Sequence, residues 1–351
     1  MANDNINMQE ESLIYRYLGY AAIPLRLVLG WMFFSAAWRR VVLASGKLQP
    51  NSPLWVGHKF NTFLPHASNF MGVGNLIHLL ILHPQALAVF LNVFTVIELL
   101  VGLSLIFGLF SRLGGLGAVA LAFGILFGSG WLGATCLDEW QVGSVEMTIG
   151  LLVLFAGSTW SLDDLVRSKW PNAANSFVYR LIGNGPLWGK GIKKWNAVFA
   201  VFAILVTMGT NQMFQGGVWG NLHNFGKKLA VSVSGANISG NNLKFVVYRT
   251  GGSGAAFAYI IKMQVNNSAG KSVYMLNQKA IEKLPVTDIH NRYINRAFIN
   301  KYSMVMQLGA KADINLPLGE KTLKSLKPGN YKLILTDISG QKFSENFSYK
   351  G

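Results

Sequence analysis

The stretch "NVFTVIELLVGLSLIFGLF", Asn92 to Phe110, is an almost unbroken apolar run that contains one carboxylate, Glu98. A helix rises ~1.5 Å per residue, so about 20 such residues cross the ~30 Å hydrocarbon core of a bilayer. A second apolar run, 113–135, begins after only Ser111 and Arg112. The two runs therefore predict a tight hairpin of membrane-spanning helices with an ionisable group inside it. Arg112, at the turn, is interpreted as a positively charged anchor at the membrane surface.

The whole chain has the composition of a membrane protein. Of its 351 residues 51% are hydrophobic and only 13% are charged, which is unusual for a soluble globular chain. Apolar segments long enough to span a bilayer lie at about 17–38, 87–110, 113–135, 142–160 and 196–214. Residues 45–85 are mixed in character, and they predict short interfacial or re-entrant helices folded onto the bundle.

From about residue 226 the pattern changes to short β-rich runs such as "KLAVSVSG", "LKFVVYR" and "YKLILTD", separated by Gly, Asn and Pro turns. Runs at this spacing predict an all-β, immunoglobulin-like sandwich after the α-helical membrane bundle. The predicted domains are a bundle over 1–170, a cytoplasmic linker over 171–195, a fifth transmembrane helix over 196–214 and the β-sandwich over 215–351.

Charge along the chain predicts its orientation. The loop 161–195 carries six Lys and Arg, which favours the cytoplasmic side. Five spans then place the C-terminal domain on the outer, periplasmic side of the cytoplasmic (inner) membrane. Cations near the end of the first span, Arg39, Arg40 and Lys47, would lie outside too, against the usual rule.

The C-terminal part is strongly basic. Lys and Arg outnumber Asp and Glu by 18 to 6 in residues 215–351, against 13 to 9 in residues 1–214. This excess indicates anionic partners, lipid headgroups or solubility in an acidic medium. No nucleic-acid partner is expected, because no recognised binding motif accompanies the charge.

Three ionisable residues lie inside predicted spans: Arg26, Glu98 and Glu146. Each costs ~2.5–3.5 kcal/mol at a helix centre, so its retention usually has a reason. One interpretation is a buried charge cluster whose carboxylates carry the protons that quinone reduction requires. The other is structural: Arg26 pairs with a glutamate, Glu98 foremost, and merely holds the helices together.

Further candidates follow the first span. Arg39, Arg40, Lys47 and His78 are candidates for binding a small dianion, since cations and imidazolium donors suit oxyanions. The alternative is ordinary contact with lipid headgroups. No metal site is predicted, because His78 and His83 are five residues apart rather than the three or four that place ligands on one helix face.

The single cysteine, Cys136, is a candidate nucleophile for sulfur chemistry, although a lone cysteine is more often a small apolar filler. The chain shows no dinucleotide fingerprint, P-loop, CxxC or haem-attachment motif. We therefore expect no flavin, haem or metal cofactor bound by motifs of this chain.

Particular motifs resemble the DoxX/DoxD membrane family: "RLVLGWMFF" (Arg26 to Phe34), "VIELLVGLSLIFGLFSRLGGLGAVAL" (Val96 to Leu121) and "GSTWSLDDL" (Gly157 to Leu165). That family has an arginine early in its first span, a Glu followed by glycines in the second, an Arg at the hairpin turn and a Trp-Ser-Leu-Asp ending. The remainder, one span and a β-rich region ending in a Pro-Gly-x-Tyr turn and strand, resembles DoxA. "SAAWRR" departs from the family's Gly-then-Lys pattern at the end of the first span.

The whole chain thus resembles a fusion of a DoxD-like bundle with a DoxA-like β domain, the arrangement of thiosulfate:quinone oxidoreductase. The resemblance implies an enzyme, a thiosulfate dehydrogenase (quinone), that couples two thiosulfates into tetrathionate and reduces a membrane quinone. Its partners would be thiosulfate, quinone and the lipid bilayer, with a homo-oligomer as a further candidate. The rival hypothesis is a non-catalytic membrane adaptor or transporter subunit that docks a periplasmic redox partner.

Overall fold

The computed structural model describes residues 8–133, 139–216 and 218–351. These residues form two compact units. The first contains the described residues of 8–56, 85–130 and 139–223, and it is almost wholly helical. The second contains 57–84, 131–133 and 224–351, and it is built around β-sheets. The predicted order, a helical region followed by an all-β region, is confirmed.

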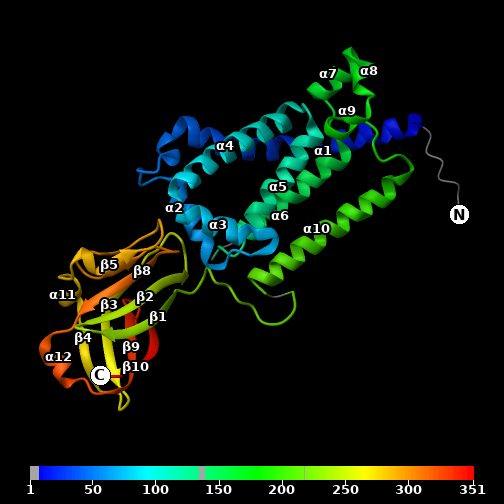
Figure 1. Cartoon of the computed structure of the whole chain (residues 1–351). Coiled ribbons are helices and arrows are strands. Elements are labelled where there is room, and N and C mark those ends of the chain that lie inside the picture. Colours follow the sequence, from blue (N-terminus) through cyan, green and yellow to red (C-terminus); the bar gives the residue numbers. More distant parts are fainter. Residues whose placement is uncertain (1–7, 134–138, 217) are drawn as a thin grey trace. The chain divides into compact units, whose positions relative to one another are not determined.

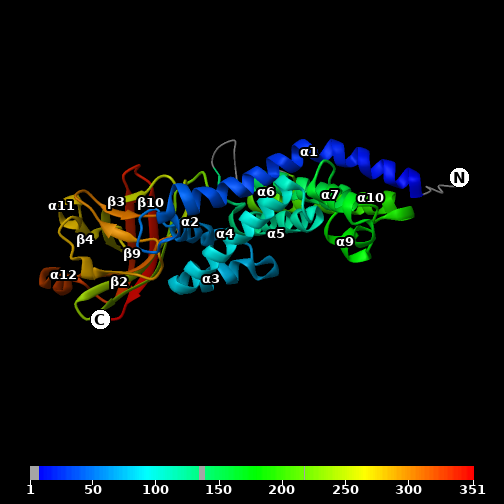
Figure 2. The same ribbon diagram turned by 90° about the horizontal axis from the view of Figure 1, so that it is seen from above.

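Long apolar helices make up the first unit, and α1 runs the length of the bundle in both views (Figure 1 and Figure 2). The long helices are α1 (Met8–Trp38), α4 (Pro84–Phe107), α5 (Ser111–Ser129), α6 (Glu139–Ala156) and α10 (Ile192–Phe214). A π-helical turn, η1 (Arg39–Leu43), prolongs α1, and a short 3-10 turn, η2 (Ser45–Leu48), follows it.

Among the described residues, four helices are long and apolar enough to cross a membrane: Leu13–Leu43, Pro84–Phe107, Ser111–Ser129 and Ile192–Phe214. The remaining predicted span, 142–160, is also a helix, α6, but it is shorter and carries Glu139 and Glu146. That α6 spans the bilayer stays a prediction. The other four predicted spans are confirmed as apolar helices of sufficient length.

Glycines bring the helices close together. A Cβ added at Gly102 of α4 would lie 2.5 Å from the backbone nitrogen of Phe34 in α1. One added at Gly115 of α5 would lie 2.9 Å from the carbonyl oxygen of Gly150 in α6. Small residues at such positions allow helix backbones to approach, which is how membrane helices gain van der Waals contact. The motif "ELLVGL" therefore places Glu98 on a helix pressed against α1.

Short helices follow α6 at the end of the bundle where the α4–α5 hairpin turns. They are α7 (Leu162–Lys169), α8 (Pro171–Ala174), α9 (Phe177–Ile182) and η5 (Gly189–Gly191). The Ser161 hydroxyl accepts a hydrogen bond from the Asp164 backbone and so caps α7. Arg112 contacts this region, so the hairpin turn and the loop share one end of the bundle, as predicted.

The second unit contains two antiparallel sheets within residues 224–351. One has the strand order β1-β2-β8-β5, and the other β10-β9-β3-β7-β6 with β4 paired to β3. Figure 1 shows them as the β part of the molecule. The strands are β1 (Ala230–Ser239), β2 (Asn242–Gly251), β3 (Ala258–Asn267), β4 (Ser272–Leu276), β5 (Ile289–Asn291), β6 (Ala297–Ile299), β7 (Met304–Met306), β8 (Lys311–Pro317), β9 (Gly329–Asp337) and β10 (Lys342–Tyr349). Short helical pieces connect them: α11 (Gln278–Ile281), η6 (Val286–Asp288) and α12 (Glu320–Ser325).

The core of the second unit is apolar and comes from both sheets. Alternate residues of β2, such as Leu243, Phe245 and Val247, face this core and are buried. Leu333 and Leu335 of β9 meet them from the other sheet. This period of two is the pattern that predicted strands here. The immunoglobulin-like topology stays a prediction.

The segment 57–84 corrects one expectation. It forms the predicted short helices: α2 (Val56–Phe63), η3 (Leu64–His66), η4 (Phe70–Gly72) and α3 (Val73–Leu82). However, these belong to the same compact unit as the β region and pack with it. Asn61 donates to the carbonyl of Gly309 at 3.0 Å and accepts from the backbone of Asn295 at 2.8 Å. Such hydrogen bonds satisfy buried polar groups. The hydrophobic periodicity of the sequence does not indicate which partners these groups have.

Candidate functional site

Glu98 lies on the buried face of α4 and is only 5% exposed. Its carboxylate accepts hydrogen bonds from both terminal nitrogens of Arg40, and one of these nitrogens also donates to the Thr95 hydroxyl. A charged pair hydrogen-bonded at both carboxylate oxygens is strongly oriented. The structure therefore fixes Glu98 and Arg40 as one unit inside the bundle.

The predicted pairing of Arg26 with Glu98 is wrong. α1 runs antiparallel to α4, so Gly30 lies opposite Ile106 and only residues near position 40 reach Glu98. Arg26 instead lies beside Gly108, at the hairpin turn: a Cβ there would be 1.8 Å from the Arg26 Nη1. The direction of a neighbouring helix decides which arginine meets the carboxylate, and one sequence does not reveal that direction.

Arg26 is incompletely bonded. It is 2% exposed, and its Nη2 lies 3.5 Å from the carbonyl oxygen of Trp160. Its Nε and Nη1 have no hydrogen-bond partner among the described residues. A buried guanidinium normally satisfies its donors, because an unmade hydrogen bond costs ~1–3 kcal/mol. These two nitrogens are therefore available to donate to a bound group.

Glu146 is the third buried charge. It is 5% exposed on α6, and its Oε2 has no hydrogen-bond partner in the described part of the chain. It lies within electrostatic range of Glu98 and of Glu139. Glu98, Arg40 and Glu146 thus occupy one region of the bundle interior. A buried carboxylate without a full set of partners is costly, which makes it a candidate for function rather than packing.

The other predicted site residues are spread more widely. Arg39 is exposed and donates to the Ser35 carbonyl at 3.2 Å. Lys47 lies in η2 and is partly exposed. His78 belongs to the second unit, where its Nε2 is 3.3 Å from the Tyr293 hydroxyl oxygen. Cys136 lies outside the described residues.

Arg112 is not the surface anchor that the sequence predicts. It is fully buried and donates to the carbonyls of Leu154, Arg180 and Gly185. Its guanidinium also lies 5.7 Å from the centroid of the Tyr15 ring. Three carbonyl acceptors hold the charge away from lipid and tie the hairpin turn to the following loop. Arg112 is therefore a structural residue of this end of the bundle.

Sequence reasoning missed the role of Asp163, although the motif "WSLDDL" contains it. Asp163 is fully buried and accepts from the backbone nitrogens of Phe110 and Ser111, both at 2.9 Å. It also accepts from the hydroxyls of Ser111 and Tyr179, at 2.6 and 2.7 Å. The carboxylate thus caps the N-terminus of α5, where negative charge is favourable. Burial and this hydrogen bond to Asp163 raise the pKa of the Tyr179 phenol.

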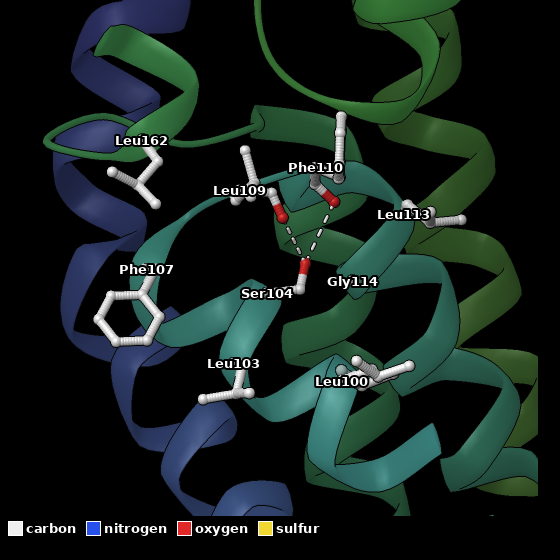
Figure 3. Close-up of a pocket in the computed structure, with 10 residues that line it drawn as sticks. Leu100, Leu103, Ser104, Phe107, Leu109, Phe110, Leu113, Gly114 and Leu162 are labelled. Carbon is white, nitrogen blue, oxygen red and sulfur yellow. Dashed lines mark hydrogen bonds between the residues drawn. The ribbon is translucent and has the colours of Figure 1, made fainter. Parts of the chain in front are cut away.

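An apolar groove adjoins the α4–α5 turn (Figure 3). Its volume is about 320 Å³, near the lower end of the roughly 300–1,000 Å³ of small-molecule sites. The Ser104 hydroxyl reaches into it but is engaged by the carbonyls of Leu109 and Phe110, at 2.7 and 3.3 Å. The lining is Leu100, Val101, Leu103, Ser104, Phe107, Leu109, Phe110, Leu113, Gly114 and Leu162.

The groove lies close to two of the buried charges. Val101, which lines it, follows Glu98 by three residues, so the two are within one helical turn, ~5 Å along the axis. Phe107 and Leu109 flank Gly108, against which Arg26 lies. The arrangement suits a flat, apolar ligand with a few polar oxygens. Across the described residues, no group of three or more His, Cys, Asp or Glu is placed to hold a metal ion.

The fold and the site define a membrane protein of the helical-bundle type, with charges buried in the bundle and a β domain attached. Two family models match it. "TQO small subunit DoxD" matches residues 21–188, and "TQO small subunit DoxA" matches residues 214–346. The chain belongs to these families as a DoxD–DoxA fusion, and its role is related to thiosulfate:quinone oxidoreductase, an oxidoreductase.

Comparison with solved structures adds little. A family 123 glycoside hydrolase from Clostridium perfringens is 13% identical over 34% of this chain and 26% of its own, with a TM-score of 0.17. The chain thus spans about a quarter of that hydrolase. The Pseudomonas fluorescens alkylpurine DNA glycosylase AlkC is 11% identical, covering 96% of this chain and 99% of its own, with a TM-score of 0.21. Scores this low carry no conclusion about fold or function.

Proposed function

We propose that the protein is a membrane thiosulfate:quinone oxidoreductase that forms tetrathionate. Two thiosulfates each lose one electron, and their outer sulfur atoms join in a new S–S bond. The quinone takes up both electrons and two protons and leaves as quinol. The observation that carries the proposal is Glu146, whose buried oxygen lacks a partner among the described residues beside the Glu98–Arg40 pair.

Protons are the part of this reaction that the buried carboxylates serve. Glu98 lies within one turn of the groove lining, and Arg40 holds its carboxylate in a single orientation. Glu146, within electrostatic range of Glu98, is the next acceptor along the bundle interior. A positioned carboxylate that gives or takes a proton typically contributes about 10²–10⁴-fold to a rate. Glu98 and Glu146 are therefore the proposed proton relay.

The groove is the proposed quinone site, because its apolar lining matches a ring with a lipid tail. Arg26 lies beside Gly108, next to this lining, and its two nitrogens without a partner among the described residues supply positive charge to stabilise the reduced quinone. Arg39 and Lys47, at the far end of α1, are proposed to attract the thiosulfate dianion from the outer side of the inner membrane. Cys136 stays the candidate nucleophile of the sulfur chemistry.

The test uses the full chain, purified in a neutral detergent, with thiosulfate and a short-chain quinone. We expect two thiosulfates to be consumed, and one tetrathionate formed, for each quinone reduced. Lys169→Gln, an exposed charge change in α7 that lies outside the proposed sites, serves as control and should leave the rate near wild type, whereas Glu98→Gln should lower it. Quinone reduction without tetrathionate would refute the proposed reaction.

A second candidate is a non-catalytic membrane adaptor or transporter subunit that docks a redox partner. The observation that favours it is that both matching families are described as small subunits. In that case the purified chain alone would reduce no quinone, and adding a separate redox enzyme would restore tetrathionate formation. The stoichiometric assay above therefore decides between the two.

A further inference from the structure

A lysine in the second unit is held between two tyrosine rings. Lys311 of β8 lies directly opposite Tyr248 of β2 in the sheet register. Its Nζ is 5.4 Å from the centroid of the Tyr248 ring and 5.7 Å from that of Tyr293. The two rings are 6.0 Å apart and nearly perpendicular, at 76°. The ammonium is therefore fixed in place rather than left on a freely moving chain.

Among the described residues the Lys311 ammonium has no direct carboxylate partner, although its charge reaches Asp313 over a longer distance. The acidic side chain on the same face of β8 is Asp313, which Arg292 engages through Nε at 2.8 Å and Nη2 at 2.6 Å. In the described part of the chain, Lys311 makes no ion pair within 4 Å. The Tyr248 hydroxyl likewise has no hydrogen-bond partner among the described residues. The cluster thus holds an ammonium without a direct ion-pair partner, and at least one hydroxyl without a hydrogen-bond partner, among the described residues.

His78 completes the cluster from a different element. Its Nε2 lies 3.3 Å from the Tyr293 hydroxyl oxygen, and its ring meets the Tyr293 ring edge-on at 5.9 Å. The helical segment 57–84 carries both His58 and His78, and it is anchored close to Tyr293. The side chain of Asn295, two residues after Tyr293, donates to the carbonyl of His58 at 3.0 Å. The donors are therefore positioned before any ligand arrives, which lowers the entropy cost of binding.

The protonation states suit an anion. Burial raises the pKa of both Tyr248 and Tyr293, so their hydroxyls stay protonated and can donate. The excess of 18 Lys and Arg over 6 Asp and Glu in residues 215–351 draws anions toward this unit.

We propose that Lys311, Tyr248, Tyr293 and His78 form a binding site for a small divalent sulfur oxyanion. The choice of thiosulfate as that anion rests on the proposed function, whereas the site itself rests on the geometry. Its donors are the Lys311 ammonium and the two phenolic hydroxyls; the His78 imidazole, by donating from Nε2 to the Tyr293 oxygen, leaves the Tyr293 O–H to point at a tetrahedral anion. No bond is made or broken there: the site captures the substrate.

The experiment measures thiosulfate binding to the full chain in neutral detergent by calorimetry, beside the KM and kcat for quinone reduction. Lys311→Gln should raise the Kd and the KM for thiosulfate at least tenfold and change kcat less than twofold. Tyr293→Phe keeps the ring and its contact with Lys311 but removes the hydroxyl, so it should weaken binding with the melting temperature unchanged. Lys342→Gln, on β10 of the other sheet, removes the same charge and should leave Kd unchanged.

Wild-type Kd and KM in both Lys311→Gln and Tyr293→Phe would overturn the site, even if the enzyme is active. Conversely, a chain that reduces no quinone but loses thiosulfate binding in Lys311→Gln would keep the site and refute the proposed function. If Tyr293→Phe lowers the melting temperature and leaves Kd unchanged, the cluster only fastens α3 to the sheet, and the proposal fails.

Discussion

Two regions of the helical bundle bury charge in opposite ways. At the hairpin turn, both oxygens of the Asp163 carboxylate accept hydrogen bonds, and each of the three guanidinium nitrogens of Arg112 donates to a backbone carbonyl. In the bundle interior, Glu98 has Arg40, but Glu146 has an oxygen without a partner among the described residues. A complete network stabilises a fold, whereas an incomplete one costs stability and needs another reason to persist.

The strongest test of the first region removes the Asp163 carboxylate. Asp163→Ala leaves two backbone N–H groups and two hydroxyls without their acceptor. Each buried unsatisfied donor costs ~1–3 kcal/mol, so we expect a loss of at least about 3 kcal/mol in unfolding free energy. Thermal unfolding of the purified protein measures it, and turnover per folded molecule should stay near wild type.

Asp164→Ala is the matched control for this change. Asp164 accepts from the Asn184 side chain at 3.0 Å but does not cap α5, so its loss should cost much less. Equal melting temperatures for the two variants would remove Asp163 from its structural role. A loss of turnover in folded Asp163→Ala would instead show that Asp163 serves activity, as the carboxylates of the bundle interior are proposed to do.

The pair of Arg40 and Glu98 tests the second region by a double-mutant cycle. Glu98→Gln should lower turnover at least about tenfold, since it removes a proton carrier. It also leaves Arg40 without its ion-pair partner, which lowers stability. Adding Arg40→Gln should restore part of the stability but none of the turnover. If the double variant recovers turnover as well, the pair only holds α1 to α4.

A smaller effect is expected at His66, which is half-buried in the second unit and outside the proposed site. Its ring stacks on Phe225 at 3.9 Å and meets Trp131 edge-on at 4.9 Å. Burial lowers the pKa of His66 below its ordinary value of about 6.5. The stability due to the neutral ring is therefore complete above that value and is lost as pH falls below it.

His66→Phe keeps the stacking and removes the titration. Between pH 7 and pH 5 its melting temperature should fall less than that of wild type, with turnover at neutral pH unchanged. Parallel falls in the two proteins would show that His66 is not protonated on unfolding. This variant thus shows how a half-buried polar residue behaves when it serves structure alone.

The sequence predicted the fold well where period and length decide it. The apolar runs became helices, and the alternating runs became two sheets, because burial of one face imposes each pattern. The sequence-based prediction failed where the position of a residue depends on a partner far away along the chain. Arg40 rather than Arg26 meets Glu98, Arg112 is buried, and residues 57–84 pack with the β region. Helix direction and long-range docking leave no periodic signal in one sequence.

The candidate site shows the same division. That Glu98 and Glu146 are buried follows from their place in apolar runs. That Glu146 lacks a partner, and that Lys311 lies between two rings, depends on side chains brought together from distant elements. Such features require the three-dimensional arrangement.

The most direct test of the central claim measures stability and turnover together in Glu146→Gln and Glu146→Leu. Removing a buried carboxylate that lacks partners should leave the melting temperature unchanged or raise it by a few degrees. Quinone reduction by thiosulfate should nevertheless fall at least about tenfold in both variants. Wild-type turnover in Glu146→Leu would contradict the claim that this carboxylate carries protons.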